Sequence, residues 1–310
     1  MSISTEISDR FWNQPQKGAE EAAREKTFID DVIQKSHIER LLRENLAGIR
    51  TVFDGGGGSG RFSVLLASLG LQVTHFDISQ PMLDTSRARA ETAGVADNIT
   101  FVHGKLEDLS AFSDRQFDLV MSFDAPISYT YPNHESVIGS LVRIAAKKLI
   151  ISVYSRLGWT PYLFNPAQKV QYILDKNTTD PFARWCLDQA GAHLADFLPD
   201  MAAVRRAFAT GLSEPAEVTA AAYDAGEAPF PVSYTFMPDE LQAILTRYGA
   251  RNVRLSGPGA LSRSIPNEVL VNIMRNEALK ADFLDFCYEY DSQLWCAGMG
   301  KDNIAAVADI

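Results

Sequence analysis

Short apolar runs alternate with amphipathic segments between residues 51 and 153. The runs at residues 51–54, 72–76, 99–103, 117–123 and 148–154 are the length of buried strands. The segments between them place apolar residues at helical spacing, so each strand is followed by a crossover helix. This alternation predicts an α/β fold in which a mainly parallel sheet is covered by helices on both faces.

The flanking regions follow a different pattern. Residues 19–47 carry an apolar stripe among many charges, which predicts one or two helices that cover a ligand cleft. After residue 154 the strand rhythm gives way to helical spacing, and the sheet resumes with strands at 252–255 and 303–308. We expect four parts: an N-terminal helical cap (1–47), a sheet core (48–154), a helical lid insertion (155–229) and a C-terminal completion of the sheet (230–310).

Charge and hydropathy narrow the class of protein. The chain of 310 residues has a formal net charge of −10, which disfavours nucleic acid as a partner because phosphate backbones are repelled. No apolar run reaches the roughly 18 residues of a membrane span, and residues 1–18 do not resemble a signal peptide. We therefore expect a cytoplasmic protein without a membrane partner.

Cysteine and histidine spacing gives no sign of a metal site. Cys186, Cys287 and Cys296 form no CxxC pair, and the five histidines form no HxH or HxxxH pair. We expect reduced, mostly buried cysteines and no bound metal.

A glycine-rich loop is the most informative segment. Residues 51–60 read TVFDGGGGSG, a strand that ends in an acid and is followed by five glycines in six positions. Glycines allow positive φ angles and close approach of the backbone to a ligand. The loop fits both GxGxxG, starting at Gly55, and DxGxGxG, starting at Asp54, so the glycines alone do not separate two kinds of adenosine cofactor.

Two acids help to separate them. Asp54 lies just below the helix N-terminus where a dinucleotide would place its pyrophosphate, and its carboxylate would repel that group. The same carboxylate attracts a cationic ligand such as S-adenosylmethionine. Asp77, at the end of the second strand, is placed to accept hydrogen bonds from ribose hydroxyls, which both kinds of cofactor possess.

Four motifs in order resemble those of class I S-adenosylmethionine-dependent methyltransferases of the small-molecule type. They are FDGGGGSG at 53–60, FDIS at 76–79, VHGKLEDL at 102–109 and FDLVMS at 117–122. The resemblance implies a Rossmann-like, doubly wound, mainly parallel seven-stranded sheet with S-adenosylmethionine as cofactor and S-adenosylhomocysteine as product. The cofactor-binding residues that it implies are Asp54, Gly55, Gly56, Gly58, Gly60, Asp77, Ile78, Met82, Leu106, Glu107, Ser122 and Phe123.

The chain departs from the family pattern at Lys105, where relatives often have an aspartate that recognises the adenine amino group. Glu107 or Asp108 is the alternative acceptor for that hydrogen bond.

The segment after the fourth strand, residues 122–135, is rich in polar groups that would face a methyl acceptor. Asp124, Tyr129 and His134 are the catalytic candidates, although His134 also fits the start of a helix and tyrosines beside a lid often provide wall area. The 13 aromatic residues between Tyr154 and Phe236 favour a small, partly apolar acceptor, or else form the core of the lid.

Together these features predict an enzyme that transfers a methyl group to an oxygen or nitrogen, less readily a carbon, of a small metabolite by in-line displacement. The alternatives are a non-catalytic S-adenosylmethionine-binding protein and an NAD(P)-dependent oxidoreductase, which the GxGxxG register supports.

Overall fold

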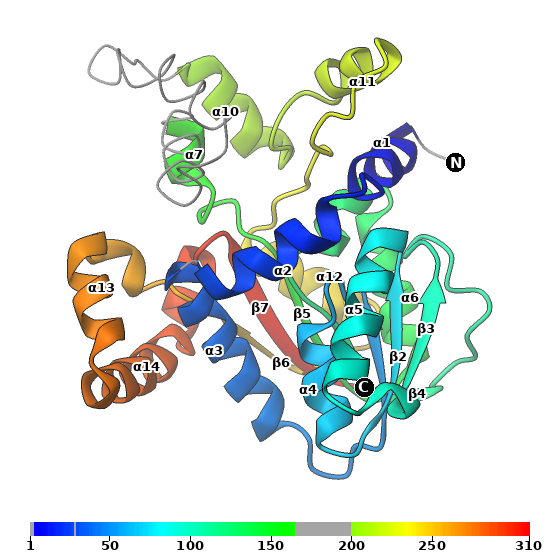
Figure 1. The fold of residues 1–310 in the computed structure, drawn as a ribbon. Coiled ribbons are helices and arrows are strands. Elements are labelled where there is room, and N and C mark those ends of the chain that lie inside the picture. The colour runs from blue at the N-terminus through cyan, green and yellow to red at the C-terminus, as the bar shows by residue number, and fades with distance from the viewer. Residues whose placement is uncertain (1–2, 28, 165–199) are drawn as a thin grey trace.

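The structure is a computed structural model that describes residues 3–27, 29–164 and 200–310 (Figure 1). Its centre is a seven-stranded sheet with the order β3-β2-β1-β4-β5-β7-β6. The strands are β1 (Thr51–Gly55), β2 (Gln72–Asp77), β3 (Ile99–His103), β4 (Phe117–Ser122), β5 (Ala145–Tyr154), β6 (Arg251–Ser256) and β7 (Asn303–Asp309). The predicted fold class, a mainly parallel seven-stranded sheet with helices, is confirmed.

Strand direction follows the connections. β1 to β5 pair in parallel, for example Val52 with Val73 and Val120 with Leu149. β7 runs antiparallel to both of its neighbours, with Ile150 opposite Val307 on β5. In the strand order, β2 lies on one side of β1 and β4 on the other, so the order reverses at β1. The carboxyl ends of β1, β2, β4 and β5 lie along one edge of the sheet, and open α/β sheets bind ligands at such a reversal.

The helices fall into three groups. The N-terminal group is α1 (Ile3–Trp12), α2 (Lys17–Thr27) and α3 (Ile29–Glu44). The sheet helices are α4 (Arg61–Ser68), α5 (Gln80–Thr92), α6 (His134–Ile144) and α12 (Pro238–Arg247), with short 3₁₀ turns η1 (Ala96–Asn98) and η2 (Pro126–Thr130). The remainder are α7 (Thr160–Phe164), α10 (Met201–Thr210), α11 (Ala216–Asp224), η4 (Ser262–Ser264), α13 (Asn267–Arg275), α14 (Glu277–Asp291) and η5 (Leu294–Met299).

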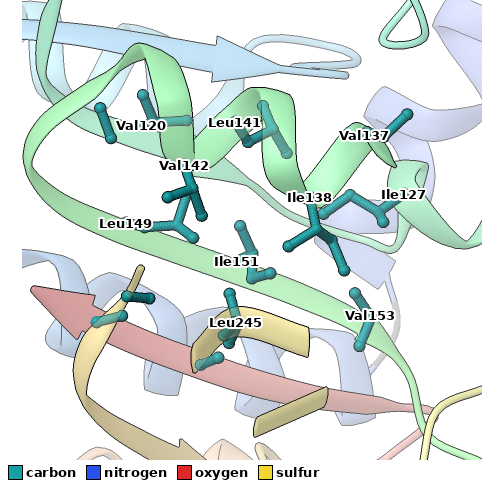
Figure 2. Packing of buried hydrophobic residues seen from close by; sticks show 14 of the residues in the cluster. Val120, Ile127, Val137, Ile138, Leu141, Val142, Leu149, Ile151, Val153 and Leu245 are labelled. Carbon is teal, nitrogen blue, oxygen red and sulfur yellow. The ribbon is translucent and has the colours of Figure 1, made fainter. Parts of the chain in front are cut away.

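Neighbouring strand residues alternate between two cores, one on each face of the sheet. Val52, Leu119 and Ile150 pack with helices α3, α4 and α5. Phe53 and Val120 pack on the other face with α6 and α12. Figure 2 shows this second core, in which Ile138 and Leu141 of α6 lie over Leu149 and Ile151 of β5, with Leu245 of α12 close by. Burial on both faces explains why the strands read as continuous apolar runs.

Helices α1 and α2 lie across the carboxyl edge of the sheet, whereas α3 runs down over one of its faces (Figure 1). α1 contacts η2, α2 contacts α5, and α3 packs against α14. Sequence analysis predicted helices within residues 19–47 but not α1, which begins at Ile3. In the lid region, α7, α10 and α11 lie beyond the same edge (Figure 1). Residues 165–199, which include Cys186 and much of the predicted lid insertion, lie outside the described residues.

Within the described residues, no helix combines the length and apolar character needed to cross a bilayer.

Candidate active site

A pocket of about 1130 Å³ opens at the carboxyl ends of β1, β2, β4 and β5. Its walls include Asp54, Asp77, Phe123 and Tyr154 from these strand ends. Residues of α1, α2 and α3 close it from the other side. Pockets for a single small ligand usually have volumes of about 300–1000 Å³, so this one has room for a cofactor and a second molecule.

The glycine loop forms the floor of one part of this pocket. The amides of Gly56 and Gly57 donate hydrogen bonds to the carbonyl of Phe76 over 2.7 and 3.2 Å, which fixes the loop against β2. Gly58 has a φ of 55°, and a Cβ added there would meet no atom within 4 Å. Since Gly58 lines the pocket, this is the position at which a side chain would take up ligand space.

The other predicted glycines serve the loop in different ways. A Cβ on Gly55 would contact Phe53 and Leu106, and one on Gly60 would overlap Ser86. Neither Gly55 nor Gly60 lines the pocket, whereas Gly56 does. Close packing of neighbouring elements accounts for glycine at both positions, and their predicted contact with the cofactor stays a prediction. Gly57, which was not among the predicted residues, lines the pocket.

Asp77 faces the pocket from the end of β2. Its Oδ2 accepts a hydrogen bond from the Gly58 amide at 2.8 Å, and its Oδ1 accepts one from the Ser79 amide at 2.8 Å. These bonds hold the carboxylate beside the loop and favour its ionised form, although burial raises the pKa of Asp77. The remaining lone pairs can accept hydrogen bonds from a ligand.

Asp54 lies deeper, with only 2% of its surface exposed. Its Oδ2 accepts a hydrogen bond from Ser63 Oγ at 2.6 Å. Burial raises the pKa of Asp54 to about 7 against the opposing effect of the Ser63 hydrogen bond, and the negative charge of Asp77 adds to the rise. Two carboxylates this close to one loop oppose a pyrophosphate and favour a ligand that carries positive charge.

Apolar side chains form the wall next to Asp77. Phe76, Ile78, Met82 and Leu106 all line the pocket. Met82 lies in the first turn of α5, where its amide donates to the Ser79 side chain at 3.3 Å. The predicted apolar residues Ile78, Met82 and Leu106 are thus brought together on one wall, as a surface that suits a flat ring.

The structure distinguishes the two acids near Lys105. Glu107 lines the pocket and accepts a hydrogen bond from Thr5 of α1 at 2.7 Å. Asp108 points away and is bonded to Ser110 on the surface. Lys105 itself forms an ion pair with Asp9 of α1 at 2.9 Å. Of the two alternatives, only Glu107 is placed to contact a ligand.

The segment that follows β4 brings two of the three catalytic candidates to the pocket. Phe123 and Asp124 line it, and so does Tyr129 from η2. Asp124 forms an ion pair with Lys35 of α3, and Arg24 Nη2 lies 3.8 Å from its carboxylate. Ser122, predicted next to the cofactor, is fully buried and does not line the pocket.

His134 is not brought to the pocket. It begins α6, and its ring stacks on that of Tyr234 with centroids 3.9 Å apart. The Tyr131 ring lies beside this pair, 5.9 Å from the His134 ring and 6.2 Å from that of Tyr234. Burial lowers the pKa of His134, which keeps the ring neutral within this stack. The structure agrees with the alternative that His134 begins a helix, and aromatic packing holds its ring away from the residues that line the pocket.

Sequence reasoning predicted that helices within residues 19–47 cover the cleft, but not which of their residues line it, nor the wall that α1 provides. Phe11 and Trp12 of α1 line the pocket, together with Arg24, Asp31 and Lys35 of the next two helices. No motif marks these residues, because their position depends on long-range packing. Tyr154 was also missed, although its place at the carboxyl end of β5 follows the rule that identified Asp77.

Charged groups at this wall form a connected network. Asp31 is 1% exposed and bonds to Lys301 at 2.6 Å and to Arg24 at 3.3 Å. Arg24 also pairs with Glu21 at 2.6 Å. Burial opposes ionisation of Asp31, but the two cations outweigh it and lower its pKa. The part of the chain that the structure describes holds no cluster of three potential metal ligands.

Comparisons with known proteins agree with this geometry. A family model described as a methyltransferase domain matches residues 52–148, which contain the glycine loop, Asp77, Leu106 and Asp124. The predicted resemblance is thereby confirmed for this part of the chain. The tRNA 5-carboxymethoxyuridine methyltransferase of Escherichia coli strain K12 is 33% identical over 84 residues, 27% of this chain and 32% of that protein. The chloroplastic magnesium protoporphyrin IX methyltransferase of Arabidopsis thaliana is 32% identical over 109 residues, 35% of this chain and 33% of that protein.

The chain thus spans about a third of the length of these curated relatives. Among solved structures, phosphoethanolamine N-methyltransferase 2 of Haemonchus contortus in complex with S-adenosyl-L-methionine aligns with a TM-score of 0.54. The identity is 16%, and the alignment covers 100% of this chain and 60% of that one. At this identity the likeness concerns the fold.

Proposed function

We propose that this chain, which carries a methyltransferase domain at residues 52–148 on a Rossmann-like sheet, binds S-adenosylmethionine and transfers its methyl group to a small, partly apolar metabolite. The acceptor atom is an oxygen or a nitrogen, and the second product is S-adenosylhomocysteine.

The observation that carries this proposal is the pairing of Gly58 with Asp77. The open space above Gly58 and the carboxylate hydrogen-bonded to its amide lie side by side in one pocket. A nucleoside ribose needs both features, a backbone that permits close approach and an acceptor for its hydroxyls. Asp54, beneath the same loop, adds negative charge on the side where the ammonium and sulfonium of the cofactor would lie.

The remaining predicted residues fit the cofactor as follows. Ile78, Met82 and Leu106 would hold the adenine between apolar surfaces, with Glu107 as acceptor for its amino group. Gly56, Gly58 and Asp54 would hold the methionine portion, and Phe123 would lie beside it. When bound, S-adenosylmethionine supplies an activated methyl group on sulfur.

The protein then has to align an acceptor and exclude water, which are the main requirements of an in-line displacement. Helices α1, α2 and α3 enclose the second part of the pocket together with Tyr129 and Tyr154. In this proposal residues 1–47 act as a cap, and residues 155–229 form the lid, of which the structure describes 155–164 and 200–229.

The enclosed second part of the pocket supports a small acceptor over a polynucleotide. The two carboxylates beside the glycine loop, Asp54 and Asp77, disfavour the dinucleotide of an NAD(P)-dependent oxidoreductase. A protein that binds S-adenosylmethionine without catalysis would have the same cofactor contacts, so product formation is the observation that separates it.

The first experiment is thermal unfolding of the purified protein with S-adenosylmethionine, S-adenosylhomocysteine, NAD and NADP at matched concentrations. Ligand at a hundred times its dissociation constant adds about 2.7 kcal/mol to the free energy of unfolding. We expect stabilisation by the first two ligands only. Stabilisation by the dinucleotides alone would refute the proposal.

Acceptors are then screened by mass gain of one methyl group, with a mixture of small metabolites and total RNA in separate reactions. Methylated RNA would refute the small-molecule part of the proposal and leave the methyltransferase activity in place. Binding of the cofactor without any methylated product would favour the non-catalytic alternative.

A further inference from the structure

The part of the pocket beyond the cofactor residues contains five aromatic side chains, which we call the aromatic corner. Phe11 and Trp12 come from α1, Tyr129 from η2, Tyr154 from the end of β5, and Phe230 from the segment before α12. All five line the pocket. Four separate regions of the chain therefore contribute to one aromatic wall.

The ring planes in this corner are steeply inclined to one another. Trp12 and Tyr129 are 5.5 Å apart at 60°, and Tyr129 and Phe230 are 5.7 Å apart at 77°. Tyr129 and Tyr154 meet at 90° with centroids 5.6 Å apart. A slot for a flat ring would need parallel walls. At these separations the rings contact one another edge to face and form one continuous aromatic surface, against which an alkylated ammonium ion can lie.

A cation of the protein already lies against this corner. The ammonium of Lys17 is 4.4 Å from the centroid of the Phe11 ring, while it also pairs with Glu20 at 2.9 Å. The faces of these rings are thus accessible to positive charge, and their quadrupoles attract it.

The charges that line the pocket favour a cation as well. Eight carboxylates and five cationic side chains are found among the described lining residues. The carboxylates are Glu20, Glu21, Asp31, Asp54, Asp77, Glu107, Asp124 and Asp302, and the cations are Lys17, Arg24, Lys35, Arg61 and Lys301. The carboxylates still outnumber the cationic side chains if Asp54 is protonated. The excess comes from Asp54, Asp77 and Glu107 beside the cofactor residues, so it lies on the side of the pocket from which positive charge passes to the acceptor.

The groups next to the corner suit a nucleophile that needs no base. Tyr129 and Tyr154 share a hydrogen bond of 2.5 Å between their hydroxyls. Burial raises the pKa of Tyr154 to about 12 and that of Tyr129 well above its usual range, so both remain neutral hydrogen-bonding groups. No histidine or cysteine is found among the described residues that line the pocket. An amine can arrive deprotonated, whereas an alcohol would require a base.

We propose that the methyl acceptor is an amine on a compact apolar body, seated in the aromatic corner, and that the reaction is N-methylation. This inference rests on the proposed methyltransferase function. The nitrogen lone pair forms the new bond to the methyl carbon, the carbon–sulfur bond breaks, and its electron pair stays on sulfur. Positive charge thereby moves from sulfur to nitrogen within a pocket whose lining has more carboxylates than cationic side chains, and a proton on the product ammonium leaves to solvent.

Equilibrium binding to the complex of the protein with S-adenosylhomocysteine tests this inference without knowledge of the natural acceptor. Titration calorimetry with benzyltrimethylammonium and with benzoate compares a cation and an anion on the same ring. We expect the cation to bind at least tenfold more tightly. Equal binding, tighter binding of benzoate, or binding of neither probe would overturn the amine assignment.

Two variants link the result to the corner. Trp12→Ala should weaken binding of benzyltrimethylammonium at least fivefold while the affinity for S-adenosylhomocysteine is retained. Trp295→Ala is the matched control, because Trp295 is 65% exposed on η5 and does not line the pocket. An unchanged affinity in Trp12→Ala would also overturn the assignment. Failure of S-adenosylhomocysteine itself to bind the unaltered protein would instead refute the proposed function.

Discussion

Lys35 of α3 forms an ion pair with Asp124, the second residue after β4. The Lys35 side chain is 2% exposed and that of Asp124 36%, so the pair lies at the boundary between the buried helix and the pocket. It connects an N-terminal helix to the loop beside the predicted methyl site. Asp124 also has a φ of 63°, a strained conformation that its surroundings must maintain. We infer that Asp124 acts mainly by holding this loop against α3.

Asp124→Asn should therefore lower the free energy of unfolding. Loss of one partner of a fully buried pair costs about 3–5 kcal/mol. Because Asp124 is partly exposed, we expect about 1–3 kcal/mol, measured by urea denaturation. Asp285→Asn is the control, since Asp285 forms an exposed pair with Arg40 and should contribute less than about 1 kcal/mol. Equal effects of the two substitutions would contradict this role for Asp124.

Gly58→Val should abolish binding of S-adenosylmethionine while the protein remains folded. The valine side chain would extend into the open space that the cofactor needs. Gly70→Val is a matched control, because Gly70 also has a positive φ, 84°, and open space around its Cα, but lies outside the pocket. Both variants carry similar backbone strain, so titration calorimetry should show loss of S-adenosylmethionine binding in Gly58→Val alone. Wild-type affinity in Gly58→Val would exclude the glycine loop as the cofactor site.

Asp77→Ala should weaken S-adenosylmethionine binding by about 1–3 kcal/mol, the usual cost of losing a charged hydrogen-bond partner. Asp77→Asn keeps one acceptor oxygen for the Gly58 amide and should lose less affinity for S-adenosylmethionine than Asp77→Ala. Asp108→Ala serves as the control, since Asp108 is bonded to Ser110 on the surface and does not line the pocket. If all three bind like the wild type in calorimetry, the ribose is recognised by other residues.

The sheet was predictable because its signal is local. Strands buried on both faces read as apolar runs, and the loop after β1 needs glycines that few other structures require in such number. Reasoning from strand ends placed Asp77 at the pocket, and the family resemblance implied Ile78, Met82 and Leu106, which also line it. Strand ends moved by one to three residues, as when β5 began at Ala145 instead of 148.

The acceptor side was less predictable because it is assembled from distant segments. Phe11 and Trp12 reach the pocket through packing of α1 against η2, which no local pattern encodes. For His134 the sequence left two alternatives open, because a polar residue after β4 can face either the pocket or the helix packed beside it. Stacking on Tyr234, 100 positions away in sequence, decides the outcome.

Asp54 gives the cofactor site a pH dependence. Its pKa of about 7 in the free protein means that the carboxylate loses its charge as the pH falls below neutrality. A bound cation favours the ionised form, so binding lowers this pKa and releases a proton. We expect the affinity for S-adenosylhomocysteine to fall as the pH drops from 7.5 to 5.5, by up to about tenfold per unit. Calorimetry in two buffers of different ionisation enthalpy would detect the proton that Asp54 releases on binding, as a difference between the two binding enthalpies. Asp54→Asn should bind with little pH dependence, and a steep dependence in that variant would assign the effect to another group.

His37 should make the folded protein less stable in mild acid. Its ring is buried in α3, where Nε2 is 3.2 Å from Ser256 Oγ and the ring lies 4.8 Å from that of Tyr288. Burial, with a smaller effect of the Arg40 charge, lowers the pKa of His37 to about 4. In the unfolded chain the value is about 6.5, so the unfolded state takes up a proton first as the pH falls. The contribution of the neutral ring is complete above pH 6.5 and is lost towards pH 4.

Between pH 7 and 5 this group alone should remove about 2 kcal/mol from the free energy of unfolding. Urea denaturation of His37→Gln should show that the free energy of unfolding falls by about 2 kcal/mol less between pH 7 and 5 than in the wild type. His103→Gln is the control, because His103 lies exposed at the end of β3. Identical pH profiles for His37→Gln and the wild type would mean that His37 is solvated or charged in the folded protein.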